Sequence, residues 1–184
     1  MVRLPGAVAS FGQATVAGSV FVGSQNGYVY SLDAQSCCYY RDYTASAGVR
    51  TAITLAHLGS RDVALFGDRR AHVYSLDVAT GKTIWKALAD DALSAHITGS
   101  PSLFEGRLYV PISMGDDSAA VDPNYECCRG RGAAVALDVL TDRQIWKTYT
   151  ILKRVPAGRI ISVRSSGSRR AFDLVVTDNR CEAP

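Results

Sequence analysis

One short stretch of the chain carries three residues whose side chains could hold a hard cation. Asp122, Asn124 and Glu126 alternate along the sequence, and their carboxylate and amide oxygens are the ligands that Ca²⁺ prefers in proteins. A polar stretch of this composition is also typical of a solvated loop, so both interpretations stay open. The stretch predicts a candidate metal site at these three residues.

The five cysteines favour neither a zinc site nor a covalently attached haem. They occur as two adjacent pairs, Cys37-Cys38 and Cys127-Cys128, with Cys181 alone, and no CxxC or CxxCH spacing is present. A disulfide between adjacent cysteines closes a strained ring and forms only in an oxidising compartment.

The remaining reactive side chains match no catalytic signature. His57, His72 and His96 lack the mutual spacing of metal ligands, so we expect each to be a strand or loop residue. No GxSxG, Walker loop or GxGxxG is present. The sequence therefore contains no motif that supports a hydrolase, NTPase or nicotinamide-dependent function.

Composition and charge exclude two further classes. The chain is 47% hydrophobic and 20% charged, as in an ordinary folded domain. The net charge of +3 is uneven, because 13 Lys and Arg face 14 Asp and Glu up to Thr150, and 7 face 3 beyond it. The repeating part thus lacks the basic footprint of a nucleic-acid binder. No apolar stretch approaches the roughly 20 residues of a membrane span, and no signal peptide is visible at the N-terminus.

The elements that position these residues come from an internal repeat. Asp33 and Asp77 lie 44 residues apart and Asp77 and Asp138 lie 61 apart, within three similar segments. An insertion of about 17 residues explains the longer spacing. The segments read GSQNGYVYSLDAQSCCYYR from Gly23, GDRRAHVYSLDVATGKTIWK from Gly67 and GAAVALDVLTDRQIWK from Gly132.

Each repeat predicts four short antiparallel strands, which is the content of a propeller blade. In the second repeat Asp77 is expected to accept hydrogen bonds from the turn and Gly81 to adopt a positive φ. The expected strands there are Thr51–Thr54, Val63–Phe66, Val73–Leu76 and Thr83–Lys86. In the first repeat they are Ser19–Val22, Tyr28–Leu32 and Tyr39–Tyr43, and in the third Ser100–Leu103, Arg107–Ile112, Ala133–Leu137 and Gln144–Tyr149.

The pattern LDxxTGKxIWK resembles the tryptophan-docking repeat of quinoprotein propellers, found in soluble quinoprotein alcohol dehydrogenases and in outer-membrane assembly lipoproteins. The resemblance covers Ser19 to Tyr149. It implies an all-β fold, a partial β-propeller of about three four-stranded antiparallel blades at 7–43, 49–88 and 98–150. It also implies that Trp85 and Trp146 pack across the neighbouring blade. Tyr40 stands where the first blade is expected to carry Trp, and Asp142 replaces the turn glycine of the third.

Further segments resemble the polyvinyl-alcohol-dehydrogenase-like branch, which pairs a quinone propeller with cytochrome c. They are GSVFVGSQNGYVYSLDA, AGVRTAIT, FGDRRAHVYSLD, ITGSPSL, GRLYVPIS and DPNYECCRGRG. The resemblance implies a periplasmic enzyme that depends on pyrroloquinoline quinone (PQQ). Such an enzyme oxidises an alcohol to a carbonyl and passes electrons to the cytochrome.

The same resemblance implies a set of cofactor contacts. Arg50 is the first candidate, because a planar guanidinium matches a carboxylate of the quinone bidentately; a solvated surface arginine is the alternative. Thr51 and Thr98 are hydroxyl donors nearby or structural strand-end residues. Cys127 and Cys128 resemble the adjacent-cysteine disulfide beside the quinone, whereas Cys37-Cys38 falls in a turn. Ca²⁺ beside the quinone would use the polar stretch named above.

The repeat stops after Thr150. Residues 151–184 are rich in Arg and Ser and predict either a disordered basic tail or the product of a translational frame error. Three blades are fewer than the 4 to 8 of a closed propeller, so we expect a fragment whose open edges meet the remaining blades or another chain. The alternatives are a non-catalytic propeller scaffold for protein interaction, or an inactive truncated gene product.

Overall fold

The computed structural model describes residues 15–36, 38–116, 121–124 and 130–150. These residues form three antiparallel sheets, which confirms the expected all-β partial propeller. The first sheet has the order β1 (Thr15–Ala17), β2 (Ser19–Gly23), β3 (Tyr28–Asp33) and β4 (Tyr39–Thr44). The second has the order β5 (Thr54–Leu58), β6 (Arg61–Gly67), β7 (His72–Asp77) and β8 (Thr83–Leu88).

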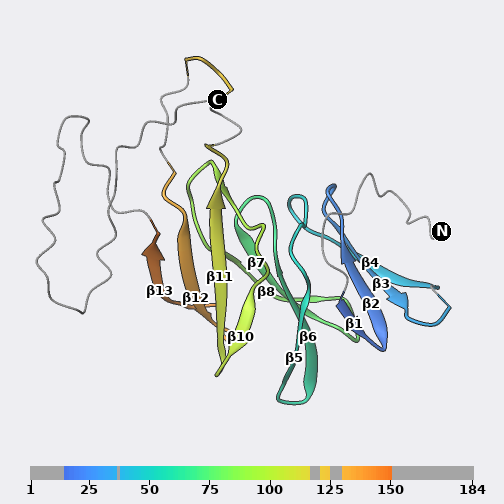
Figure 1. The fold of residues 1–184 in the computed structure, drawn as a ribbon. Coiled ribbons are helices and arrows are strands. Elements are labelled where there is room, and N and C mark those ends of the chain that lie inside the picture. Colours follow the sequence, from blue (N-terminus) through green and yellow to red (C-terminus); the bar gives the residue numbers. More distant parts are fainter. Residues whose placement is uncertain (1–14, 37, 117–120, 125–129, 151–184) are drawn as a thin grey trace, which may run out of the picture.

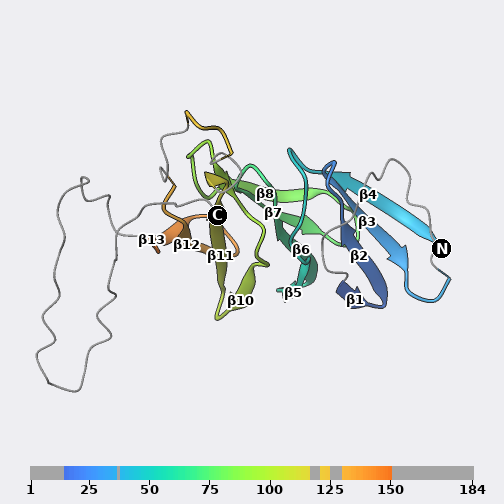
Figure 2. The same cartoon turned by 45° about the horizontal axis from the view of Figure 1, so that its top comes forward.

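The third sheet carries one extra strand. Its order is β10 (Ser102–Phe104), β11 (Arg107–Met114), β12 (Ala133–Asp138) and β13 (Gln144–Tyr149), and the short β9 (Ala95–His96) pairs with the end of β11. Figures 1 and 2 show the three sheets side by side in chain order, like the sectors of a fan. We call them blades 1, 2 and 3.

Two of the expected strands begin later than the sequence indicates. The strand expected at Thr51–Thr54 starts only at Thr54, and the one expected at Ser100–Leu103 starts at Ser102. The reason is a contact between blades, because the amide of Ala52 donates to Ser100 Oγ at 2.9 Å. Thr54 Oγ1 also donates to the Pro101 carbonyl at 2.6 Å. These backbone groups therefore join the first strands of blades 2 and 3 before either ladder begins.

A turn aspartate closes each blade. Asp77 Oδ1 accepts the amide of Thr80 at 2.7 Å and its hydroxyl at 2.8 Å, and Asp33 and Asp138 accept equivalent bonds. The Thr80 hydroxyl and then its amide hold the pKa of Asp77 below its ordinary value. Gly81 has φ of 71°, as expected, and Asp142 takes the same left-handed conformation with φ of 57°. An Asp tolerates this conformation better than most residues.

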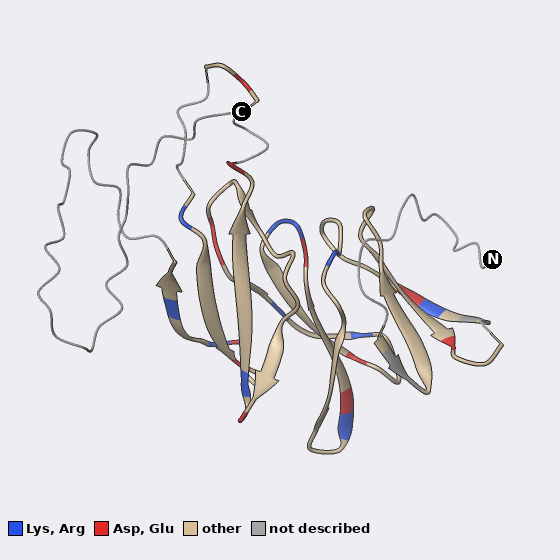
Figure 3. Cartoon of the chain, in the orientation of Figure 1, with Lys and Arg blue, Asp and Glu red and all other residues tan. Residues whose placement is uncertain are grey.

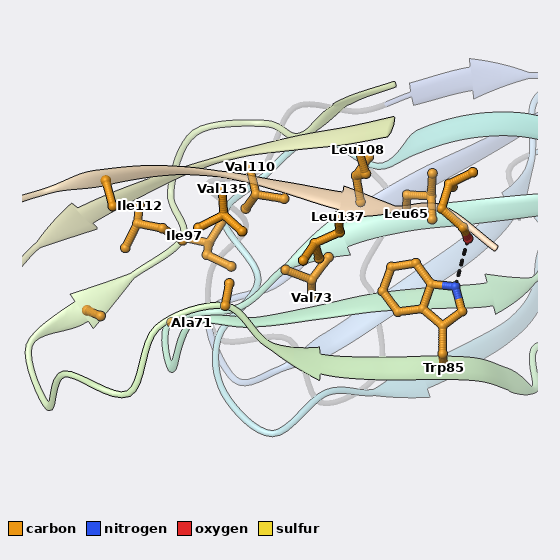
Figure 4. Packing of buried hydrophobic residues seen from close by; sticks show 14 of the residues in the cluster. Leu65, Ala71, Val73, Trp85, Ile97, Leu108, Val110, Ile112, Val135 and Leu137 are labelled. Carbon is orange, nitrogen blue, oxygen red and sulfur yellow. Dashed lines mark hydrogen bonds between the residues drawn. The ribbon is translucent and has the colours of Figure 1, made fainter. Parts of the chain in front are cut away.

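Trp85 ties blade 2 to blade 3. Its indole Nε1 donates to the Val139 carbonyl at 2.9 Å across the seam, and the side chain is 9% exposed. Figure 4 shows the indole beside Leu65 and Leu137 at the end of the core that the two blades share. A buried tryptophan contributes a large apolar area only if its N–H finds an acceptor, and here it does.

The residue of blade 1 that corresponds to Trp85 is Arg41, so the expectation placed on Tyr40 is wrong. Trp85 lies opposite Ser75, Trp146 opposite Ala136 and Arg41 opposite Ser31. In each blade the register shifts just before this residue, as at a β-bulge, so the preceding residue is the extra one. Tyr40 is that extra residue and is 54% exposed.

A buried carboxylate organises the turn between β6 and β7. Asp68 is fully buried, and its Oδ1 accepts the amides of Arg70 and His72 at 2.8 and 3.0 Å. Its Oδ2 accepts the Tyr74 hydroxyl at 2.7 Å. The same hydroxyl accepts the Ser46 amide at 2.9 Å, so Tyr74 connects this turn to the chain that enters blade 2.

Replacement of the two tryptophans separates a docked indole from an undocked one. Trp85→Phe removes the bond to Val139 and leaves a gap in the seam, so we expect a loss of about 2 kcal/mol in the free energy of unfolding. Trp146 is 39% exposed, so Trp146→Phe should cost less than about 0.5 kcal/mol. Urea denaturation of both variants measures the difference, and equal losses would contradict this assignment.

Because of Tyr74, we expect the free energy of unfolding to fall at alkaline pH. Burial raises its pKa to about 12, and Asp68 acts in the same direction. The folded state therefore holds this proton more tightly than the unfolded state, whose tyrosines titrate near pH 10. The contribution is complete below pH 10 and is lost as the pH rises towards 12. The urea midpoint of the wild type should fall more steeply between about pH 9 and 11.5 than that of Tyr74→Phe. Parallel curves would contradict this prediction.

Candidate functional site

The three sequence-predicted cofactor residues that the structure describes, Arg50, Thr51 and Thr98, lie at one end of the blades. We define the upper rim as the β2–β3 turn (residues 23–28), the β6–β7 turn (67–72) and the connectors at 45–53 and 89–101. These segments lie at the upper side of the sheets in Figure 1. The turns that carry Asp33, Asp77 and Asp138 lie at the opposite end of the strands.

Backbone hydrogen bonds fix the rim segments to one another. The Val49 amide donates to the Ser24 carbonyl at 2.8 Å, and the Arg69 amide donates to the Gly48 carbonyl at 2.9 Å. The Ile97 amide in turn donates to the Asp68 carbonyl at 3.1 Å. Each connector therefore contacts the turn of the blade before it, and the first connector also contacts the turn of the blade after it. Such bonds order a surface that would otherwise consist of separate loops.

Close approach of the connectors requires glycine at two turn positions. A Cβ on Gly23 would lie 2.6 Å from Val49 Cγ1, and a Cβ on Gly67 would meet the side chain of Ile97 even more closely. Val49 and Ile97 are completely buried. These two contacts place Arg50 and Thr98, the next residue in each connector, at equivalent positions of successive blades.

Arg69 is a site residue that sequence reasoning missed. Its amide bonds Gly48, two residues before Arg50, and its carbonyl accepts His96 Nδ1 at 2.7 Å, two residues before Thr98. Its side-chain Nε is buried and has no hydrogen-bond partner among the described residues. A buried cationic donor without an acceptor is costly unless a ligand supplies one. The available signal was the pair Arg69-Arg70, where the equivalent turn of blade 1 has Gln25-Asn26.

The environment of Thr51 favours the structural one of its two expected roles. It is completely buried, and its hydroxyl lies 3.3 Å from the Gly67 amide and 3.4 Å from the Gly67 carbonyl. Its hydrogen-bonding capacity is therefore used within the protein. Thr98 is exposed, with its hydroxyl 3.0 Å from Ser113 Oγ. Of the two threonines, Thr98 is the one that a ligand at the rim could reach.

Only Asp122 and Asn124 of the three candidate metal residues are described, so the predicted site stays a prediction. Asp122 Oδ1 accepts the amide of Asn124 at 2.9 Å and its side-chain NH₂ at 3.3 Å, so the two form a local turn. No group of three His, Cys, Asp or Glu side chains among the described residues could hold a metal ion. Glu126, Cys127 and Cys128 lie outside the described residues, as do Cys37 and the tail 151–184.

The charged side chains of the described residues are scattered and do not form a continuous basic surface at the rim. Figure 3 shows Lys, Arg, Asp and Glu of the described residues spread over strand ends and turns. His57 lies apart from the rim in β5, with Nδ1 2.8 Å from Asp62 Oδ1 on the neighbouring strand. The arrangement suits a small ligand with one or two carboxylates, because a guanidinium binds such a group through paired N–H donors. No helix in the described part is long and apolar enough to span a membrane.

Comparison with solved structures supports the fold. A europium-containing methanol dehydrogenase matches 80% of this chain and 27% of its own, with a TM-score of 0.54 and 24% identity. The quinohemoprotein alcohol dehydrogenase of Comamonas testosteroni matches 77% of this chain and 21% of its own, with a TM-score of 0.57 and 19% identity. At these identities the likeness concerns the propeller fold alone.

Sequence comparison identifies nearer relatives. No family model matches the chain. A polyvinylalcohol dehydrogenase of a Pseudomonas species is 42% identical over 147 residues, and one of a Sphingopyxis species is 40% identical over 144. The chain spans 23% and 22% of the length of these relatives. The chain is thus similar, over about three quarters of its length, to one part of the polyvinylalcohol dehydrogenases, and its fold is that of the propeller in alcohol dehydrogenases of known structure.

Proposed function

We propose that this chain is the cofactor-binding part of a PQQ-dependent alcohol dehydrogenase, with PQQ held at the upper rim. The observation that carries the proposal is Arg69, whose buried Nε lacks a partner among the described residues beside the connectors of Arg50 and Thr98. The identity of 42% with a polyvinylalcohol dehydrogenase supports the same assignment. In this proposal Arg50 and Arg69 bind carboxylates of the quinone, and Thr98 donates a hydroxyl bond.

The reaction proposed for the intact enzyme is oxidation of an alcohol to a carbonyl. When bound, PQQ supplies the acceptor for the hydride equivalent that leaves the alcohol carbon. The protein binds and orients the cofactor, and the polymeric alcohol named for the relatives is the proposed substrate. Cytochrome c is the proposed electron acceptor and the periplasm the proposed location.

Two further assignments complete the proposal. Ca²⁺ is proposed as a second cofactor beside the quinone, with the oxygen atoms of Asp122, Asn124 and Glu126 as its candidate ligands. The outer face of blade 3, where Trp146 is 39% exposed, is proposed to pack on a further blade as Trp85 packs on blade 3. Both belong to the intact protein, of which this chain is a part.

Binding of PQQ tests the rim. We expect Arg69→Ala and Arg50→Ala each to weaken PQQ binding about tenfold or more, because each removes charge-assisted hydrogen bonds to a carboxylate. Arg61→Ala is the matched control, since Arg61 is exposed at the start of β6, at the opposite end of the blade. Absorbance titration at about 0.15 M salt measures the dissociation constants with nonspecific attraction screened.

The outcomes separate the enzyme from a scaffold. Wild-type affinity in both rim variants would rule out the site, and an equal loss in Arg61→Ala would indicate nonspecific attraction of an anion. If the wild type itself binds no PQQ with Ca²⁺ present, the non-catalytic scaffold is the better description. Dye reduction with an alcohol after reconstitution would extend the result from binding to catalysis.

A further inference from the structure

The seam between blades 1 and 2 differs from the seam between blades 2 and 3 at its docking residue. In blade 2 that residue is Trp85, which is buried and bonds the Val139 carbonyl. In blade 1 it is Arg41, whose Nη1 donates to the Ala79 carbonyl of blade 2. Ala79 follows Asp77 by two residues, and Val139 follows Asp138 by one. Arg41 thus reaches the equivalent turn with a slender exposed side chain in place of an indole.

A cavity lies where the indole is missing. It measures about 30 Å³ and is lined from blade 1 by Phe21 and Arg41 and from blade 2 by Ala64, Leu76 and Val78, with other residues around them. A volume of this size holds one or two water molecules. Its apolar walls, which give water few partners, instead favour an apolar occupant.

The walls of this cavity correspond to the walls around Trp85. Phe21 pairs with Ser31 as Leu65 pairs with Ser75. Across the seam, Ala64 pairs with Leu76 as Leu108 pairs with Leu137. Leu65, Leu108 and Leu137 belong to the cluster that surrounds Trp85.

One wall of the cavity is smaller than its counterpart. Ala64 replaces the Leu108 of the second seam, so the pocket in the first seam is wider on the side of blade 2. The first seam therefore has a cavity at the position that the Trp85 indole fills in the second, and Arg41 lines that cavity.

We propose that the cavity between blades 1 and 2 binds a small planar aromatic molecule, with indole as its model. The ring displaces the Arg41 side chain, whose removal from the seam is inexpensive because it is solvent-exposed. A ring N–H then donates to the backbone of the Val78–Ala79 turn, as the Trp85 N–H donates to Val139. Phe21 and Tyr43, which also line the cavity, offer aromatic faces and edges to the ligand. The released guanidinium can stack over the bound ring.

The test uses indole as the probe and the melting temperature of the whole chain as the readout. Saturating indole should raise the Tm of the wild type by about 2 °C, because the ligand binds only the folded state. Arg41→Ala opens the pocket further, so its increase should be larger, about 4 °C. Addition of 1-methylindole, which lacks the ring N–H, should give less than half of either increase.

A substitution that supplies the indole covalently provides the complementary test. Arg41→Trp should fill the cavity, raise the Tm without ligand by roughly 4 °C and abolish the response to indole. Tyr40→Trp is the matched control, since it adds an indole one residue away on the bulged, exposed position and should leave the indole response unchanged.

Each outcome bears on the proposal. No indole response in either the wild type or Arg41→Ala would overturn it, as would an undiminished response in Arg41→Trp. If Arg41→Trp does not fold, the wild-type and Arg41→Ala titrations decide the question alone. An equal response in a Trp85→Phe background would further support the first seam as the site, since that substitution alters only the second.

Discussion

The contact on which the described fold depends is made by the residue eight positions after each turn aspartate. A four-stranded sheet buries only one face when it packs on a single neighbour, so blades must be joined at both faces to form a core. In blade 2 the joint is the Trp85 indole, which fills the seam and bonds a backbone carbonyl of blade 3. A β-bulge in each blade precedes this residue, and in blades 1 and 2 the residue reaches the next blade while the one before it lies in solvent.

The docking contact at the lower end of the strands also affects the rim at the upper end. Once neighbouring blades are held at a fixed distance, each connector has to cross the adjacent turn, and the Val49 and Ile97 amides find acceptors there. Glycine at positions 23 and 67 leaves room for this crossing. The rim is thus rigid because of backbone hydrogen bonds. Arg50, Arg69 and Thr98 can then vary for binding without loss of the loops that carry them.

Electrostatics at the rim is local. Asp68 is a buried carboxylate whose oxygens accept two amides and the Tyr74 hydroxyl, so it stabilises the turn. Arg69, in the same turn, keeps a buried donor without an acceptor among the described residues. The rim therefore combines a carboxylate whose hydrogen bonds are made with a half-buried guanidinium that has one unpaired donor among the described residues, whereas the carboxylates at the other end bond their own turns. This combination gives the anionic quinone of the proposed function a physical reason to bind at this end.

The sequence alone determined the all-β class, the three blades and most of their strands, because turn aspartates, glycines and alternating apolar residues are local signals. It also named Arg50, Thr51 and Thr98, with Cys127 and Cys128, as candidate cofactor residues. The constant spacing of eight residues from the turn aspartate already pointed to Arg41 instead of Tyr40, and the strand register confirms it. The sequence did not show the place of Arg69 or the satisfied hydroxyl of Thr51, since both follow from contacts between residues 16 or more positions apart. Only the packing of one blade on the next, which is a property of the tertiary structure, decides those contacts.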